Sequence, residues 1–215
     1  LVCLANLCPP EGAGEEMNSF MYQSAAHGII PQMAECFGVP LIRRAIIGRA
    51  MCQHLDYEVN TQDTDEVEDL YLLLAEIIAK YPEIKGVSCG AILSTYQRLR
   101  VENVCNRLKL TPLTYLWQMN RDQLLDELCH HQFEVILVKV AGAGLDPYKH
   151  LGKTLSHLKP QLYHLHNKLG LDVCGEGGEY ESLVLDCPMF SRSGMRLRVL
   201  SSEVLLDDED CSVGN

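Results

Sequence analysis

The sequence lacks any long apolar run. None of its apolar stretches approaches the roughly 20 residues that a membrane-spanning helix needs, although 47% of the 215 residues are apolar. The apolar residues 1–7 have no basic flank and form too short a run for a secretory signal peptide. We therefore predict a globular chain with no membrane-spanning segment.

Positive charge is scarce. The chain has 18 Lys and Arg residues against 29 Asp and Glu residues, which gives a formal net charge of −11. A general nucleic-acid binder needs a basic surface, because phosphate contacts supply most of its affinity. This balance argues against nucleic acid as the partner, although a local basic patch remains open.

Cysteines with the spacing of a metal site are also missing. Ten cysteines are scattered along the chain, and no Cys-x-x-Cys pair occurs, so a structural zinc site is not expected. A chain of this length can bury enough core to fold without disulfides. We therefore predict reduced thiols and a cytoplasmic protein, with His130, His131, His164 and His166 on polar helix faces.

Neither glycine-rich stretch is a dinucleotide fingerprint. Tyr180 follows Gly175-x-Gly177 where the third glycine should stand, and Pro147 follows Gly142-x-Gly144. No Walker lysine motif is present. These absences exclude the two commonest glycine-loop nucleotide sites.

The first half of the chain alternates strand and helix patterns. Parallel sheets with right-handed crossovers produce this order, and their ligands bind at the carboxyl ends of the strands, where Asn6 and Gly90 fall. The predicted strands cover residues 1–7, 39–46 and 86–89, and the predicted helices cover residues 20–37, 63–81 and 94–108.

The second half has a different rhythm, and we place a boundary near residue 110. Strands are expected over residues 113–117, 135–140, 183–185 and 195–199, with helices from residue 120, near residue 151 and again after Pro160. The predicted fold is α/β: a Rossmann-like parallel sheet over residues 1–110, then a smaller α/β domain over residues 111–200. Residues 201–215 are read as an acidic tail, and residues 207–215 are expected to be disordered.

One candidate site follows the third predicted strand, at residues 90–105. Ser94, with Gln97 three residues later, has the pattern of a capping box, so a helix should begin there. Arg98 and Arg100 lie just beyond the first turn, where cations do not favour a helix. They could bind an anion held at the helix start, or Arg98 could pair with Glu102 on a solvated face.

The second candidate site is the stretch of residues 174–182. It carries Glu176, Glu179 and Glu181 on a glycine-rich backbone that a ligand can approach closely. The clustered carboxylates repel each other unless a positive group lies among them. Mg²⁺ is one candidate, and a cationic substrate group that also contacts the Tyr180 ring is another. The alternative is a solvent-exposed acidic hairpin.

Together these motifs resemble the diphthine–ammonia ligase family, which belongs to the PP-loop ATPases of the adenine nucleotide α-hydrolase-like superfamily. The resemblance covers about residues 1–190 with its order intact. The matching blocks are DEVEDL at 65–70, GAILSTYQRLRVE at 90–102, LW at 116–117, VAGAGLD at 140–146, HLGK at 150–153, CGEGGEYE at 174–181 and LDCP at 185–188.

The resemblance implies the last step of diphthamide synthesis. Diphthine on elongation factor 2 would be amidated with ammonium, while ATP, with Mg²⁺, is split to AMP and pyrophosphate. It implies nucleotide binding by Ala5, Asn6, Leu7, Gly90, Ser94, Tyr96, Gln97, Arg98 and Arg100. It also implies substrate binding by Gly175, Gly177, Gly178 and Tyr180, and catalytic roles for Glu176, Glu179 and Glu181, with Mg²⁺ held through Glu176 or Glu179.

The chain departs from the family at its start. The family opens with a strand and a Ser-Gly-Gly-Lys-Asp-Ser-type loop around the ATP phosphates, and this sequence contains neither. We expect this chain alone not to run the ATP-dependent step, either as part of a longer enzyme or as a naturally shortened, inactive form. Two alternatives stay open: a non-catalytic module that docks on elongation factor 2, and a PP-loop relative that modifies tRNA.

Overall fold

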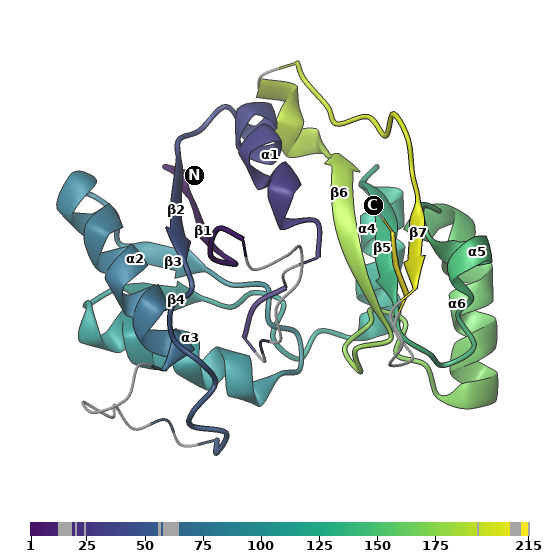
Figure 1. Cartoon of the computed structure of the whole chain (residues 1–215), viewed down its shortest axis with the longest axis horizontal. Helices are drawn as coiled ribbons and strands as arrows, with labels where there is room; N and C mark the ends of the chain where they lie inside the picture. The colour runs from purple at the N-terminus through teal and green to yellow at the C-terminus, as the bar shows by residue number, and fades with distance from the viewer. Residues whose placement is uncertain are drawn as a thin grey trace. The chain divides into compact units, whose positions relative to one another are not determined.

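The chain forms two units. The computed structural model describes residues 1–12, 19, 21–23, 25–55, 57, 65–192, 194–206 and 212–214. The N-terminal unit comprises Leu1–His27 and Val39–Gln118, and the C-terminal unit comprises Gly28–Gly38 and Met119–Asn215 (Figure 1). Residues Gly28–Gly38 thus belong with the second half of the chain, which the sequence pattern did not indicate.

The N-terminal unit is α/β with short parallel sheets. Strand β1 (Leu4–Cys8) pairs in parallel with β2 (Leu41–Ala45), and β3 (Gly86–Ser88) pairs in parallel with β4 (Thr111–Leu113) (Figure 1). The parallel direction was predicted correctly. The hydrogen-bonded ladders of the described residues form two separate two-stranded sheets, however, where the sequence predicted one.

Two helices supply most of the core of this unit. Helix α2 (Glu66–Lys80) buries Val67, Leu74 and Ile77 along one face. Helix α3 (Thr95–Arg107) buries Val101, Val104 and Cys105 in the same way. These faces pack into one cluster with residues of both sheets and their borders, including Leu7, Ile42, Val87 and Leu110.

The C-terminal unit is built on an antiparallel sheet with the strand order β6-β5-β8-β7. The strands are β5 (Glu134–Val140), β6 (Tyr180–Asp186), β7 (Val204–Leu206) and β8 (Ser212–Gly214). The predicted strands at 135–140 and 183–185 are confirmed. The strand predicted at 195–199 is wrong, because these residues join no ladder. Strands β7 and β8 fall in the segment that we read as an acidic tail.

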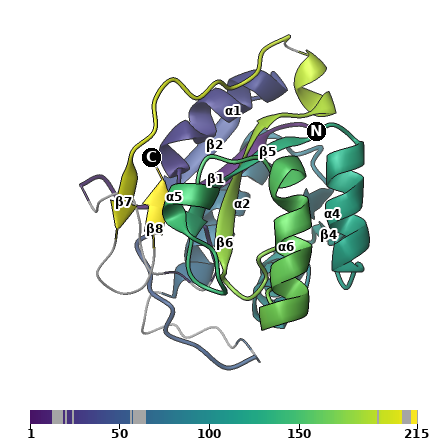
Figure 2. The ribbon, with the colours of Figure 1, turned by 90° about the vertical axis from the view of Figure 1, so that its right-hand side faces the viewer.

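Helices cover this sheet and close its core. They are α1 (Ile30–Phe37), α4 (Arg121–His130), α5 (Pro147–His150) and α6 (Leu155–Leu169), with 3₁₀ turns η1 (His27–Ile29) and η2 (Pro188–Arg192). Helix α6 packs on β5 and α4 packs beside α6 (Figure 2). Leu125, Leu137 and Leu162 lie fully buried in the cluster between them. Helix α1 contacts η2 through Phe37 and Phe190, whose rings meet edge to face at 4.9 Å.

Three helix boundaries differ from the prediction. The helix expected over residues 20–37 begins at Ile30, with Pro31 in its first turn, and ends as expected at Phe37, where Gly38 caps it in a left-handed conformation. The helix expected from residue 63 begins at Glu66 with Asp65 as its N-cap, and Asp63 lies outside the described residues. Helix α6 continues through Pro160, because one face of the helix is buried along its length. No helix in the described part of the chain is long and apolar enough to cross a membrane.

Candidate functional site

The start of α3 has the local structure that the sequence predicted. Ser94 is the N-cap, and its Oγ accepts the backbone N–H of Gln97 at 3.3 Å. Gly90, two residues beyond β3, is exposed, and a Cβ added there would meet no atom within 4 Å. The chain is therefore open at Gly90, on the approach to the helix start.

Arg98 adopts the alternative arrangement named for it. Its Nη1 pairs with Oε1 of Glu102 at 2.7 Å, one helical turn away. Its guanidinium also lies 4.4 Å from the centroid of the Trp117 ring, which supports a cation–π contact. The ion pair between Arg98 and Glu102 is confirmed.

Arg100 lies inside the N-terminal unit, with a relative exposure of 0%. Its Nη2 donates to the carbonyl oxygens of Cys52, at 2.5 Å, and His54, at 2.8 Å. The guanidinium lies 3.3 Å from the centroid of the Tyr96 ring and 5.4 Å from that of Tyr57. Arg100 therefore fixes the backbone of residues 52–54, and in this arrangement it presents no surface to a phosphate.

The acidic start of α2 binds the backbone between residues 47 and 52, directly before the segment that Arg100 holds. One carboxylate oxygen of Asp69 accepts the N–H groups of Ile47 and Gly48, both at 2.8 Å. One oxygen of Asp65 accepts those of Met51 and Cys52 at 3.1 and 3.0 Å. The burial of Asp65 and Asp69, at 4% exposure each, was not readable from spacing.

Glu66 is the third buried acid of this helix start, with 1% exposure. Its Oε2 accepts the hydroxyl of Ser19 at 2.7 Å. Burial is the largest effect on this group and raises the pKa of the Glu66 carboxyl. Burial likewise raises the pKa of Tyr22, whose hydroxyl donates to the Glu66 carbonyl at 3.2 Å.

The residues of β1 that the resemblance assigns to the nucleotide occupy three different environments. Ala5 is exposed, Asn6 is half-buried and Leu7 is in the core. Asn6 lies in the middle of β1, so the prediction that it stands at the carboxyl end of the strand is wrong. Its Oδ1 accepts from Nε of Arg43 at 2.6 Å, and Nη2 of the same arginine donates to the His27 carbonyl at 2.7 Å.

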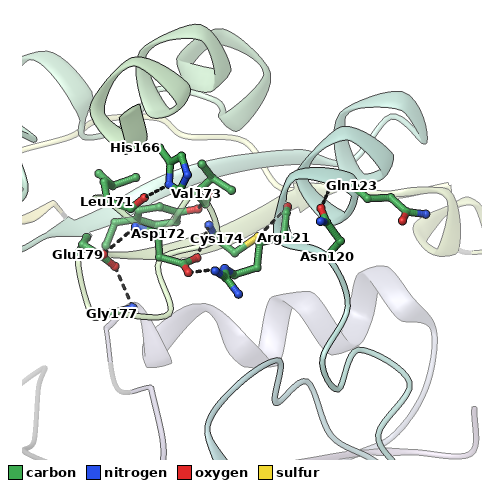
Figure 3. A network of polar contacts seen from close by, with 11 residues as sticks. Asn120, Arg121, Gln123, His166, Leu171, Asp172, Val173, Cys174, Gly177 and Glu179 are labelled. Atoms are coloured by element: carbon green, nitrogen blue, oxygen red, sulfur yellow. Dashed lines mark hydrogen bonds and ion pairs between the residues drawn. The ribbon is translucent and has the colours of Figure 1, made fainter. Parts of the chain in front are cut away.

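In the C-terminal unit, Glu179 closes the glycine-rich loop upon itself (Figure 3). Its Oε1 accepts the backbone N–H of Asp172 at 2.8 Å, and its Oε2 accepts that of Gly177 at 2.9 Å. Glu176 is exposed. Glu181 lies on β6, where its Oε1 is 3.8 Å from Nζ of Lys139. The three glutamates thus occupy different environments rather than forming one cluster.

Two glycines of this loop have a steric reason to be glycine. Gly175 has a φ of +76°, and a Cβ there would lie 2.9 Å from the Tyr180 carbonyl oxygen. A Cβ on Gly177 would lie 2.6 Å from Oε1 of Glu179. Gly178, also in a left-handed conformation, donates its N–H to the Gly175 carbonyl at 3.0 Å. Glycine therefore lets the Glu179 carboxylate reach the backbone.

Tyr180 belongs to the core of the C-terminal unit. It is 6% exposed, and its hydroxyl donates to the Val173 carbonyl at 2.7 Å. Burial raises its pKa. This placement favours a structural role for the ring over the cation–π contact with substrate that was one of the candidates.

An ion pair that the sequence did not predict lies at the base of the loop. Nε of Arg121, the first residue of α4, is 2.5 Å from one carboxylate oxygen of Asp172, and the other oxygen accepts the N–H of Cys174 at 2.9 Å (Figure 3). The Cys174 thiol donates to the Arg121 carbonyl at 3.4 Å. Burial, followed by the charge of Asp172, raises the pKa of the Cys174 thiol to about 12. The sequence offered one signal for this ion pair, which is a cation directly after the helix cap Asn120.

A preformed metal centre is not part of this arrangement. Among the residues that the structure describes, no three His, Cys, Asp or Glu side chains come together as a metal site would require. Both oxygens of Glu179 already accept backbone N–H groups. The loop therefore does not by itself fit a bound Mg²⁺.

Comparison with known proteins defines the class. Residues 12–112 match the family model of the diphthamide synthase N-terminal domain, and residues 120–210 match that of the diphthamide synthase C-terminal domain. The chain therefore has the two domains of a diphthamide synthase, in order.

Individual relatives agree. The diphthine–ammonia ligase of Homo sapiens is 48% identical over 212 residues, which are 98% of this chain and 77% of that protein. That of Mus musculus is 51% identical over 213 residues with the same coverage. That of Schizosaccharomyces pombe is 50% identical over 89% of this chain and 31% of its own length. The chain belongs to the diphthine–ammonia ligase family.

Proposed function

We propose that this protein amidates diphthine on elongation factor 2 with ammonium and ATP, in the cytoplasm, releasing AMP and pyrophosphate. The observation that carries the proposal is membership of the family over nearly the whole chain, with both synthase domains matched. The N-terminal unit, with its parallel strands and helices, is then a PP-loop ATPase type of domain.

The chemistry follows from the leaving group. A carboxylate is a poor acyl donor, so its oxygen attacks the α-phosphorus of ATP and pyrophosphate leaves. Ammonia then attacks the acyl carbon, and AMP leaves with the bonding electrons while the nitrogen loses its extra proton. The protein must hold the acyl group close to the nucleotide and neutralise phosphate charge.

The nucleotide residues proposed from the resemblance stand in the N-terminal unit. The exposed Gly90 and the helix start at Ser94 offer an approachable backbone of the kind that binds anions. Arg98 and Arg100 hold Glu102 and two backbone carbonyls. Their contribution to binding is therefore the positioning of α3 and of residues 52–54. Mg²⁺ would arrive on the ATP phosphates.

The acyl substrate residues stand in the C-terminal unit. Diphthine carries a trimethylammonium group, and an exposed carboxylate on a glycine-rich loop suits a large cation. Glu176 is the exposed glutamate of this loop, so we assign it the direct contact. Glu179 shapes the loop through its two backbone contacts. Glu181 belongs to the adjoining strand β6.

The test is reconstitution with purified elongation factor 2 that carries diphthine. This chain, and a version preceded by the family's opening strand and Ser-Gly-Gly-Lys-Asp-Ser-type loop, are each incubated with ATP, Mg²⁺ and ammonium. Mass spectrometry of the modified histidine peptide and chromatography of AMP give the readouts.

Amide formation with equimolar AMP in either form supports the proposal. If both forms bind the factor without forming amide or AMP, the protein is a docking module and the proposal is wrong. Equilibrium binding of ATP-Mg to the two forms then shows whether the added loop is needed for the nucleotide.

A further inference from the structure

Helix α4 begins with a residue that its own stability does not favour. Arg121 occupies the first helical position, after the cap Asn120, whose Oδ1 accepts the Gln123 N–H at 2.9 Å (Figure 3). A cation in the first turn opposes the helix dipole. The position therefore calls for a second explanation, which its partner supplies.

That partner is at the root of the glycine-rich loop. Nε of Arg121 pairs with Asp172, whose side chain is 14% exposed against 36% for Arg121. The other oxygen of Asp172 caps the N–H of Cys174, and the Asp172 N–H donates to Glu179. The Arg121 carbonyl meanwhile accepts the Cys174 thiol. One arginine thus engages both ends of the chain segment that enters the loop.

The contacts form a continuous chain from the helix to the loop. They run from Arg121 to Asp172, from Asp172 to Glu179, and from Glu179 to Gly177, the residue directly after Glu176. Each link is a hydrogen bond or ion pair of 2.9 Å or less. A change in the first link therefore reaches the backbone that carries the exposed carboxylate.

We propose that Arg121 and Asp172 are a positioning pair, which sets the glycine-rich loop so that Glu176 meets the trimethylammonium group of diphthine. This inference rests on the proposed function, and the two residues act through Glu176. Neither residue contacts the substrate in this account. Breaking the pair should therefore weaken recognition of the diphthine-bearing factor and leave the use of ATP unchanged.

The experiment measures binding of diphthine-bearing elongation factor 2 by calorimetry, and KM for the factor and for ATP in whichever form turns over. The variants are Arg121→Gln, Arg121→Lys, Asp172→Asn and the double variant Arg121→Gln with Asp172→Asn. Asp172→Asn keeps an oxygen for the Cys174 N–H and removes the charge. The matched control is Lys159→Gln, which breaks the 2.7 Å ion pair of α6 with Asp126 of α4, away from the loop.

We expect Arg121→Gln and Asp172→Asn each to weaken factor binding by about 5- to 20-fold, with the double variant no worse than the weaker-binding single one, because coupled partners are not additive. Arg121→Lys should recover part of the loss, since its charge remains. In a Glu176→Gln background, Arg121→Gln should add less than about twofold. The KM for ATP and the Lys159→Gln control should match the wild type.

Several outcomes would overturn the inference. Additive losses in the double variant would mean that Arg121 contacts the substrate itself. Wild-type affinity for the factor in Arg121→Gln, or the same loss of affinity in Lys159→Gln, would mean that the pair only stabilises the fold. These results are distinct from failure of the proposed function, in which the wild type neither amidates the factor nor prefers its diphthine form.

Discussion

Oε2 of Glu179 accepts the backbone N–H of Gly177, two residues before it in the chain, at 2.9 Å. The same carboxylate holds the N–H of Asp172 through its second oxygen. Glu179 therefore holds the backbone of the glycine-rich loop in place. This structural role distinguishes it from Glu176, which is exposed.

Replacing Glu179 with Gln should therefore destabilise the protein. The amide nitrogen of Gln would face a backbone donor, and one N–H would lose its acceptor, at a cost of about 1–3 kcal/mol. Urea unfolding measures the change. Glu176→Gln is the matched control, and its free energy of unfolding should stay within about 0.5 kcal/mol of the wild type while factor binding falls. Equal losses of stability in the two variants would contradict this structural role of Glu179.

Gly48→Ala should be among the most damaging glycine substitutions in the N-terminal unit. A Cβ there would lie 2.5 Å from the backbone of Asp65 and of Glu66, so the segment that Asp69 holds must move. We expect a loss of more than about 2 kcal/mol, in the range of overpacking. Gly28→Ala, where no atom lies within 4 Å of an added Cβ, should be nearly neutral. A thermal unfolding midpoint of Gly48→Ala equal to that of Gly28→Ala would refute the steric account.

Arg100→Gln should lower stability far more than Arg98→Gln. The first change leaves the His54 carbonyl oxygen without its Arg100 donor, while the Cys52 carbonyl keeps the Tyr96 hydroxyl, at about 1–3 kcal/mol, and it also removes the guanidinium from the Tyr96 ring. The second removes a partly exposed pair with Glu102 and a cation–π contact with Trp117, each worth about 1 kcal/mol at most. The denaturant concentrations at the unfolding midpoints of the two variants test this prediction. If Arg100→Gln instead keeps its stability and only raises the KM for ATP, Arg100 is a phosphate ligand after all.

Glu66 and Glu68 should contribute to stability with opposite pH dependences. Burial raises the pKa of Glu66 above its ordinary value of 4.5. The folded state therefore holds the Glu66 proton more tightly, and this contribution to stability declines as pH rises above 4.5. The Arg107 guanidinium, 2.7 Å from Glu68, lowers the pKa of Glu68. That contribution is full above pH 4.5 and is lost as pH falls through the folded pKa.

The measurement compares the free energies of unfolding of the wild type, Glu66→Gln and Glu68→Gln between pH 3 and pH 7, a range that reaches about two units to either side of the ordinary carboxyl pKa. The advantage of the wild type over Glu66→Gln should shrink with rising pH. Its advantage over Glu68→Gln should grow and then level off. A flat difference for Glu66→Gln would mean that the Glu66 carboxyl titrates as it does in the unfolded chain.

The sequence predicted local structure well where the cause is local. The cap Ser94 and the pair of Arg98 with Glu102 depend on neighbours three or four residues away. The family resemblance rested on contiguous motifs, which survive without any knowledge of the fold.

The sequence did not predict the burial or the partners of most charged side chains. Arg100 and Arg98 lie two residues apart with similar flanks, yet one is fully buried and the other pairs with Glu102. Residues 52 and 54, which supply the carbonyls for Arg100, are more than 40 residues away in the chain. Arg121 and Asp172 meet across a similar separation.

The sequence by itself thus determined the family, the α/β class and the ends of its best-capped helices, because these depend on short-range hydrogen bonds and periodicity. Only the tertiary structure decided which of the charged residues are exposed and which bind the backbone. A buried charge must find its partner wherever the fold brings one, and that partner is set by contacts between segments rather than by spacing along the chain.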